Sequence, residues 1–281
     1  MKRVAFLLTA VIAFALVSCE DSAISESEVI DLDFATEVTM ESAEEDVTTI
    51  TDAADELFEL SFGRTEMGAR DEILDCATVE RDTVNQIITI DFGDGCEGKR
   101  GRVRSGKIIV TYDGNRRTEG SFRSVTFDNF FVDSTQVEGT RTKTVTAVDA
   151  ENLSITVDIT LTGGKLTFGD GTSATREAQK TRVWSFDASG DHVTTVSGSA
   201  SGVNREGVSY SMAITEDIVF QRACWRAGVF VPVSGVKMFT VGESTATIDY
   251  GDGECDNLAT KTQDGVSEEI ELSVRGRRRR G

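Results

Sequence analysis

The sequence is poor in the residues that usually build a catalytic or metal centre. Its 281 residues include one histidine, His192, and one proline, Pro232. The five cysteines show no Cys-x-x-Cys spacing, which argues against a zinc site. There is no Gly-x-Ser-x-Gly motif and no phosphate-binding loop. A nucleophilic triad is therefore poorly supported, and the single proline excludes a proline-rich stalk.

Long apolar runs are also missing. The longest covers residues 4–17, is interrupted only by Thr9, and follows the cationic start Met1-Lys2-Arg3. A membrane-spanning helix needs about 20 apolar residues, so this run is too short to cross the hydrocarbon core. Its length and its cationic flank are typical of the apolar region of a signal peptide. We therefore expect residues 1–18 to be an export signal.

The end of this run resembles the lipobox of bacterial lipoproteins, in which two aliphatic or small residues and one small residue precede a cysteine. The matching residues are Leu16-Val17-Ser18-Cys19. The resemblance implies that the Cys19 thiol receives a diacylglycerol and that a dedicated peptidase cuts between Ser18 and Cys19. It also implies acylation of the new amino group. Because two or more chains are needed for stable anchoring, a triacylated Cys19 would attach the protein firmly to a membrane.

Residues 19–33 read as an acidic tether. Glu20 and Asp21 follow Cys19 at once, and Glu26 and Glu28 come soon after. In some Gram-negative lineages an acidic cluster after the lipidated cysteine resembles a surface-export signal. In others an acidic residue there favours retention in the inner membrane. We expect the outer membrane, with its outward face as the favoured side.

The charge balance argues against nucleic acid as a partner. The chain has a formal net charge of −19, and the signal holds two of its cations and no carboxylate, which leaves −21. Such a charge favours solubility and repels phosphates. The one basic cluster lies in the tail, residues 275–281. We interpret it as a solvated tail, and the alternative is a contact with anionic glycolipid or with the acidic body.

Four cysteines remain once Cys19 is set aside for lipid. An even number in an exported protein indicates disulfides, and four cysteines permit three pairings. The sequence separates them into an N-terminal and a C-terminal pair. We predict Cys76–Cys96 and Cys224–Cys255, each closing a β segment.

Residues 34–75 form a segment with helical character. Apolar residues recur near helical spacing between Phe34 and Phe58, and acidic residues lie between them. This pattern predicts one or two amphipathic helices. We expect them to cover a β core, and a partner-binding helix is the alternative.

From residue 76 to 274 the period changes to two. Apolar and polar residues alternate in residues 88–92, 107–111, 155–161, 208–220 and 246–250, and a phenylalanine-rich strand is expected in 125–131. Turn signals lie at residues 113–115, 163–164, 189–191, 204–207 and 264–265. The fold class is therefore mainly β. We predict a large antiparallel up-and-down meander of ten or more strands, as a curled sheet, sandwich or open barrel with the helical segment packed on it.

A strand followed by Gly-Asp-Gly occurs at residues 90–96 and 248–255, each time close to a cysteine, and more weakly at 166–171. The unit resembles Gram-negative surface lipoproteins, and that resemblance supplies no activity. The carboxylates of Asp91, Asp94, Asp249 and Asp252 are weak candidates for calcium ligands. The preferred interpretation is a tight turn in which Gly adopts positive φ and Asp bonds to the backbone.

No activity follows from these patterns, so we expect a non-enzymatic binding, adhesion or structural domain without a cofactor. Its partners would be the membrane, through the Cys19 lipid, and an envelope protein, a glycan or a hydrophobic ligand. Trp184 and Trp225 could stack on sugars, although core packing is the simpler role. One alternative is a lipid carrier, which needs an apolar cavity under the helical segment. Another is a secreted glycan-acting hydrolase, which needs convergent carboxylates, and the 48 acidic residues leave that open.

Overall fold

The computed structural model describes residues 26–60, 73–98, 101–187, 191–229, 231–242 and 244–272. The predicted lipobox with Ser18 and Cys19 and the basic tail lie outside these ranges. The predictions made for them stay predictions.

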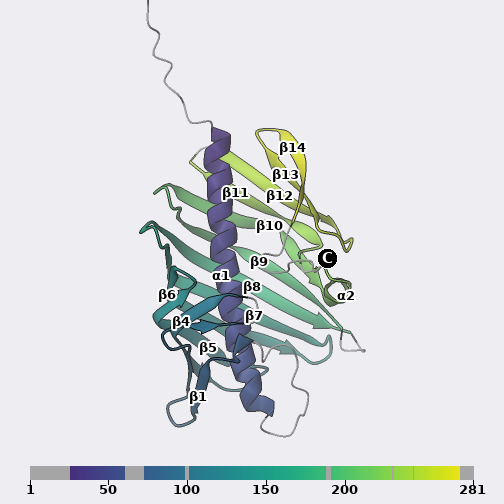
Figure 1. Cartoon of the computed structure of the whole chain (residues 1–281). Helices are drawn as coiled ribbons and strands as arrows, with labels where there is room; N and C mark the ends of the chain where they lie inside the picture. The colour runs from purple at the N-terminus through teal and green to yellow at the C-terminus, as the bar shows by residue number, and fades with distance from the viewer. Residues whose placement is uncertain are drawn as a thin grey trace, which may run out of the picture.

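Within the described residues, fourteen antiparallel strands form one up-and-down sheet that does not close (Figure 1). Neighbouring strands follow the chain order from β1 to β14, and only the short β3 lies off this path, paired with β4. The strands are β1 (Thr78–Asp82), β2 (Ile87–Asp91), β3 (Cys96–Glu97), β4 (Val103–Asp113), β5 (Phe122–Val132), β6 (Thr135–Asp149), β7 (Ser154–Thr167), β8 (Ser173–Phe186), β9 (His192–Val203), β10 (Ser209–Gln221), β11 (Ser234–Val241), β12 (Ser244–Asp252), β13 (Leu258–Gln263) and β14 (Val266–Glu271). The predicted meander is confirmed.

One long helix, α1 (Glu26–Leu60), lies across a single face of this sheet and crosses the strands. In Figure 1 its first residues lie near β11 to β14 and its last residues near β1. The helix starts at Glu26, inside the segment 19–33 that the sequence predicts as a tether. Glutamate is a good helix former and acidic residues suit a first turn, which explains the earlier start.

The core lies between α1 and the face of the sheet that it covers, which we call the inner face. Val47, Ile50 and Ala54 of α1 are buried in one cluster with strand residues that include Ile90 and Ile108. A second cluster covers the inner face further along the sheet, around Met212, Phe239 and Ile248. Burying each large apolar side chain contributes roughly 1.5–3 kcal/mol, so α1 is an integral part of the first cluster.

Two irregularities change the predicted pattern of strands and turns. Gly163 and Gly164, predicted to form a turn, lie inside β7, where the pairing register shifts. Gly139 of β6 faces them, and a Cβ there would lie 2.9 Å from the Gly164 Cα. The glycines therefore allow two backbones to approach at a bulge. In β5 a positive φ at Asn129 places Phe130 in the core.

Both predicted disulfides are present. Cys76–Cys96 joins the turn before β1 to β3, and Cys224–Cys255 joins the short helix α2 (Arg222–Arg226) to the loop after β12. Each bridge lies towards one end of the sheet, so the two disulfides secure different halves of the domain.

Candidate functional site

The inner face of the sheet is unusually rich in cations. In β8 the buried or half-buried inward residues include Arg176, Lys180 and Arg182, and in β6 they include Arg141 and Lys143. Between these strands, β7 presents apolar side chains such as Val157 and Ile159. This face therefore alternates cationic and apolar strands, in a chain whose net charge is strongly negative.

The acidic side chains of α1 meet these cations, and we call this set of ion pairs the ionic seam. Each pair joins α1 to the sheet or to one of its loops, at 4.0 Å or less. The pairs are Glu41–Lys237 (2.8 Å), Glu41–Lys180 (3.1 Å), Glu44–Arg176 (2.8 Å), Glu44–Lys180 (4.0 Å), Glu45–Arg182 (4.0 Å), Asp46–Arg104 (2.7 Å), Asp46–Arg102 (3.0 Å), Asp52–Lys143 (3.5 Å), Asp55–Arg123 (3.1 Å) and Glu56–Arg116 (3.7 Å).

Parts of the ionic seam are almost free of solvent. The Arg176 side chain has 0 % of its surface exposed, and the Arg104 and Asp46 side chains have 6 % and 10 %. Burial alone would raise the pKa of Glu41, but Lys237, Lys180 and Arg176 outweigh it and hold that pKa well below its usual value. Glu41 is therefore charged at neutral pH. Because a mispaired charge is costly here, we expect the ionic seam to fix how α1 sits on the sheet.

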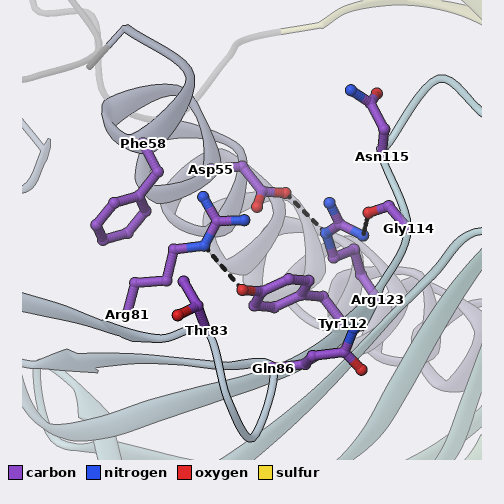
Figure 2. A pocket seen from close by; sticks show the side chains of 9 residues that line it. All are labelled: Asp55, Phe58, Arg81, Thr83, Gln86, Tyr112, Gly114, Asn115 and Arg123. Carbon is purple, nitrogen blue, oxygen red and sulfur yellow. Dashed lines mark hydrogen bonds and ion pairs between the residues drawn. The ribbon is translucent and has the colours of Figure 1, made fainter. Parts of the chain in front are cut away.

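A cavity of about 450 Å³ lies at the C-terminal end of α1, and we call it the arginine pocket. Its lining comes from α1, from the β1–β2 hairpin, from β4 and β5 and from the loop between them (Figure 2). The lining residues are Asp55, Phe58, Arg81, Thr83, Gln86, Tyr112, Gly114, Asn115 and Arg123. The volume is within the range of small-ligand sites.

Tyr112 stands between two guanidinium groups in this pocket. The Arg81 and Arg123 Cζ atoms lie 4.8 Å and 5.2 Å from the centre of its ring, and the Arg81 Nε donates a hydrogen bond of 2.8 Å to the Tyr112 hydroxyl. Arg81 also lies over the Phe58 ring, 5.3 Å from its centre. Stacking of this kind stabilises a cation and restricts its orientation.

The two arginines differ in their remaining contacts. Arg123 donates to Asp55 Oδ2 at 3.1 Å and to the carbonyl oxygens of Asp113, Gly114 and Phe122. It is therefore fixed and neutralised by Asp55. Arg81 forms no ion pair with a carboxylate of the described chain, and Figure 2 shows its guanidinium between Phe58 and Asp55. The charged residues of the lining are thus two arginines and one carboxylate, a net charge of +1, and the exposed Arg81 lies beside two aromatic rings.

The Gly-Asp-Gly units are built as turns. Asp91 Oδ1 accepts a hydrogen bond from the Gly93 amide at 2.8 Å, and Asp249 Oδ1 accepts one from the Gly251 amide at 2.9 Å. Asp91 also pairs with Lys107 at 2.9 Å. No group of three or more possible metal ligands occurs in the described ranges, and so Asp94 and Asp252 belong to no such group.

The other residues singled out by sequence lie away from the arginine pocket. The His192 ring packs at a tilt against Phe186 and edge-on against Trp225. Burial lowers the pKa of His192, and the nearby charge of Arg222 lowers it further. Trp184 packs beside a small inner cluster of β6 and β7, and Lys143 lies 5.4 Å from its ring centre. Both aromatic side chains thus have packing roles, although Trp225 remains 36 % exposed.

A second, narrow cavity lies under α1 between Val47 and Leu161, and its volume is about 30 Å³. One water needs roughly 10–15 Å³ measured in this way, so the cavity has room for about two waters. Its wall includes the buried Arg141. Burial lowers the pKa of Arg141, and the negative charge of Glu44 offsets only part of that effect.

Comparisons with protein-family models, with curated proteins and with solved structures gave no match. Among the helices described, none has the length and apolar character needed to cross a membrane.

Sequence reasoning missed Arg81, Tyr112 and Arg123. They come from three strands and meet only because β2 and β4 pair in one register and α1 ends above them. The sequence did contain an indication for Arg123. It lies two residues before the core residue Val125 in β5, so both side chains point to the same face of the sheet.

Proposed function

We propose that this chain is a lipid-anchored cell-envelope protein whose β domain binds or supports other molecules and is not an enzyme. The observation that carries the proposal is the lipobox-like end of the apolar run at Cys19, only seven residues before α1 begins at Glu26. Seven residues span at most about 25 Å. A lipid on Cys19 would therefore hold the start of α1 close to the membrane.

The ionic seam makes α1 suitable as a rigid arm between that anchor and the sheet. Carboxylates from Glu41 to Glu56 are paired with cations, and apolar residues between them are part of the core. A helix rises about 1.5 Å per residue, so Asp55 lies about 44 Å along α1 from Glu26. The arginine pocket would thus stand at the end of the arm away from the lipid.

Two features favour this proposal over the alternatives. A carrier needs space for an acyl chain under α1, and the described cavity there has a volume of about 30 Å³. A glycan hydrolase needs two convergent carboxylates in a cleft. Asp55 is the single carboxylate of the arginine pocket, and it is bonded to Arg123.

Metabolic labelling with an alkyne fatty acid tests the anchor. The wild-type chain and a Ser25→Ala control should incorporate the label and fractionate with the outer membrane. A Cys19→Ala variant should lose the label and should not be processed. Equal labelling of Cys19→Ala and wild type would refute the proposal. A separate experiment, digestion of intact wild-type cells by external protease, shows whether the domain faces outward.

A further inference from the structure

We propose that the arginine pocket binds a small organic anion, in which a carboxylate or phosphate group is joined to a flat apolar part. The first argument is charge. Asp55 compensates Arg123, whereas no carboxylate of the described chain forms an ion pair with Arg81. An anionic group beside Arg81 would complete the pairing that the pocket leaves open.

The second argument is the arrangement of donors. Arg81 uses its Nε on the Tyr112 hydroxyl, and Figure 2 shows its terminal nitrogens between Phe58 and Asp55, two residues that line the cavity. A guanidinium presents its donors as a planar fork, which fits two oxygens of a carboxylate or phosphate. The Nε bond to Tyr112 leaves this terminal part of the fork for a ligand.

The third argument is the apolar surface next to that charge. Phe58 and Tyr112 both line the cavity, and each lies close to the Arg81 guanidinium. A flat group attached to the anion could stack on either ring, and such contacts add to affinity when the rings are already held in place. A volume of about 450 Å³ has room for a ring together with its charged substituent.

The fourth argument is that the pocket is preorganised. Arg123 is held by Asp55 and three carbonyl oxygens, and the Tyr112 amide of β4 donates to the Gln86 carbonyl, in the turn of the β1–β2 hairpin, at 2.9 Å. The hairpin is itself closed by Asp82, which accepts from the amides of Val84 and Asn85. Arg123, Tyr112 and the hairpin are therefore held in place before a ligand binds, which lowers the entropic cost of binding.

The net charge of −19 means that the molecule as a whole repels anions. Binding of an anion would depend on local contacts with Arg81 and would not arise from a general basic surface. The inference is independent of the lipid anchor, since the pocket consists only of residues of the β domain and the end of α1.

Isothermal titration of the mature, detergent-solubilised chain with phenyl phosphate and with benzoate tests the proposal, with benzyl alcohol as the uncharged probe. We expect at least one anion to bind saturably with a dissociation constant below about 10 mM, and we expect no binding of the alcohol. Arg81→Gln should weaken binding about tenfold or more, because it removes a charge-assisted contact. Arg117→Gln removes an equal charge from the neighbouring loop outside the pocket and should leave binding unchanged.

Asp55→Asn gives a second, opposite readout. Removing this carboxylate raises the positive charge of the pocket, so anion binding should tighten, provided that thermal unfolding shows a folded chain. If that variant unfolds, Arg81→Lys replaces it. This variant should bind with an affinity between those of the wild type and Arg81→Gln, because lysine keeps the positive charge but lacks the paired donors of the guanidinium. The proposal is overturned if neither anion binds the wild type, or if Arg81→Gln and Arg117→Gln weaken binding equally.

Discussion

Replacing Asp46 by asparagine should destabilise the protein more than any comparable change at an exposed ion pair. The Asp46 carboxylate accepts from Arg104 Nη2 at 2.7 Å, from Arg104 Nε at 3.0 Å and from Arg102 Nη1 at 3.0 Å. Arg104 has 6 % of its side chain exposed. Removing one partner of a buried pair costs about 3–5 kcal/mol, because the other charge is left without compensation. Asparagine keeps one acceptor, so we expect about 3 kcal/mol.

Asp170→Asn is the matched control, since Asp170 pairs with Arg205 at the surface and both side chains are more than a third exposed. A surface pair contributes about 0–1 kcal/mol, and asparagine can keep the turn bond to Thr172. Urea unfolding followed by circular dichroism gives both free energies. A loss below 1 kcal/mol for Asp46→Asn, equal to that of the control, would refute the idea that the ionic seam holds α1.

The double variant Asp46→Leu/Arg104→Met separates the pair's net contribution from the cost of an unpaired charge. Replacing a buried pair by apolar residues of similar volume is often close to neutral. We therefore expect the double variant to be more stable than Arg104→Met alone. A double variant that loses the sum of both single effects would contradict this account of the ionic seam.

Further predictions concern other parts of the fold. Because the folded pKa of Glu41 is lowered, its contribution to stability is full above its unfolded pKa of about 4.3 and is lost as pH falls through the folded value. Glu41→Gln should flatten the acid limb of the stability curve measured by thermal unfolding between about pH 2 and 6. Replacing both Cys224 and Cys255 by serine opens a bridge with a sequence separation of 31, which should lower the free energy of unfolding by roughly 3–4 kcal/mol in denaturant titrations. Gly139→Ala should cost about 2 kcal/mol or more, because a Cβ there meets the Gly164 backbone at a positive φ, whereas Gly95→Ala, with ordinary contacts, should cost less than about 1 kcal/mol.

The sequence predicted the features that depend on local periodicity and on counting cysteines. Alternation of apolar and polar residues, as in residues 155–161, located strands correctly, and the separation of four cysteines into two pairs located both disulfides. Each of these follows from neighbours in the chain or from the even number of thiols left after Cys19 is assigned to lipid.

The errors arose where contacts between strands override local signals. Gly163-Gly164 looks like a turn, but β6 and β8 pair on either side of it and keep it extended at a bulge. No prediction was made for the cations of β8, although Arg176 and Lys180 alternate with exposed residues in step with the buried Ala174 and Ala178. Only the acidic face of α1, more than 100 residues away in the sequence, explains why those charges point inward.

Mass spectrometry of the mature N-terminal peptide decides whether Cys19 holds the molecule to a membrane, as we propose. We expect a peptide that begins at Cys19 and carries a diacylglyceryl thioether with an acylated amino group. A peptide that begins elsewhere, or a Cys19 with an unmodified thiol, would contradict this proposal.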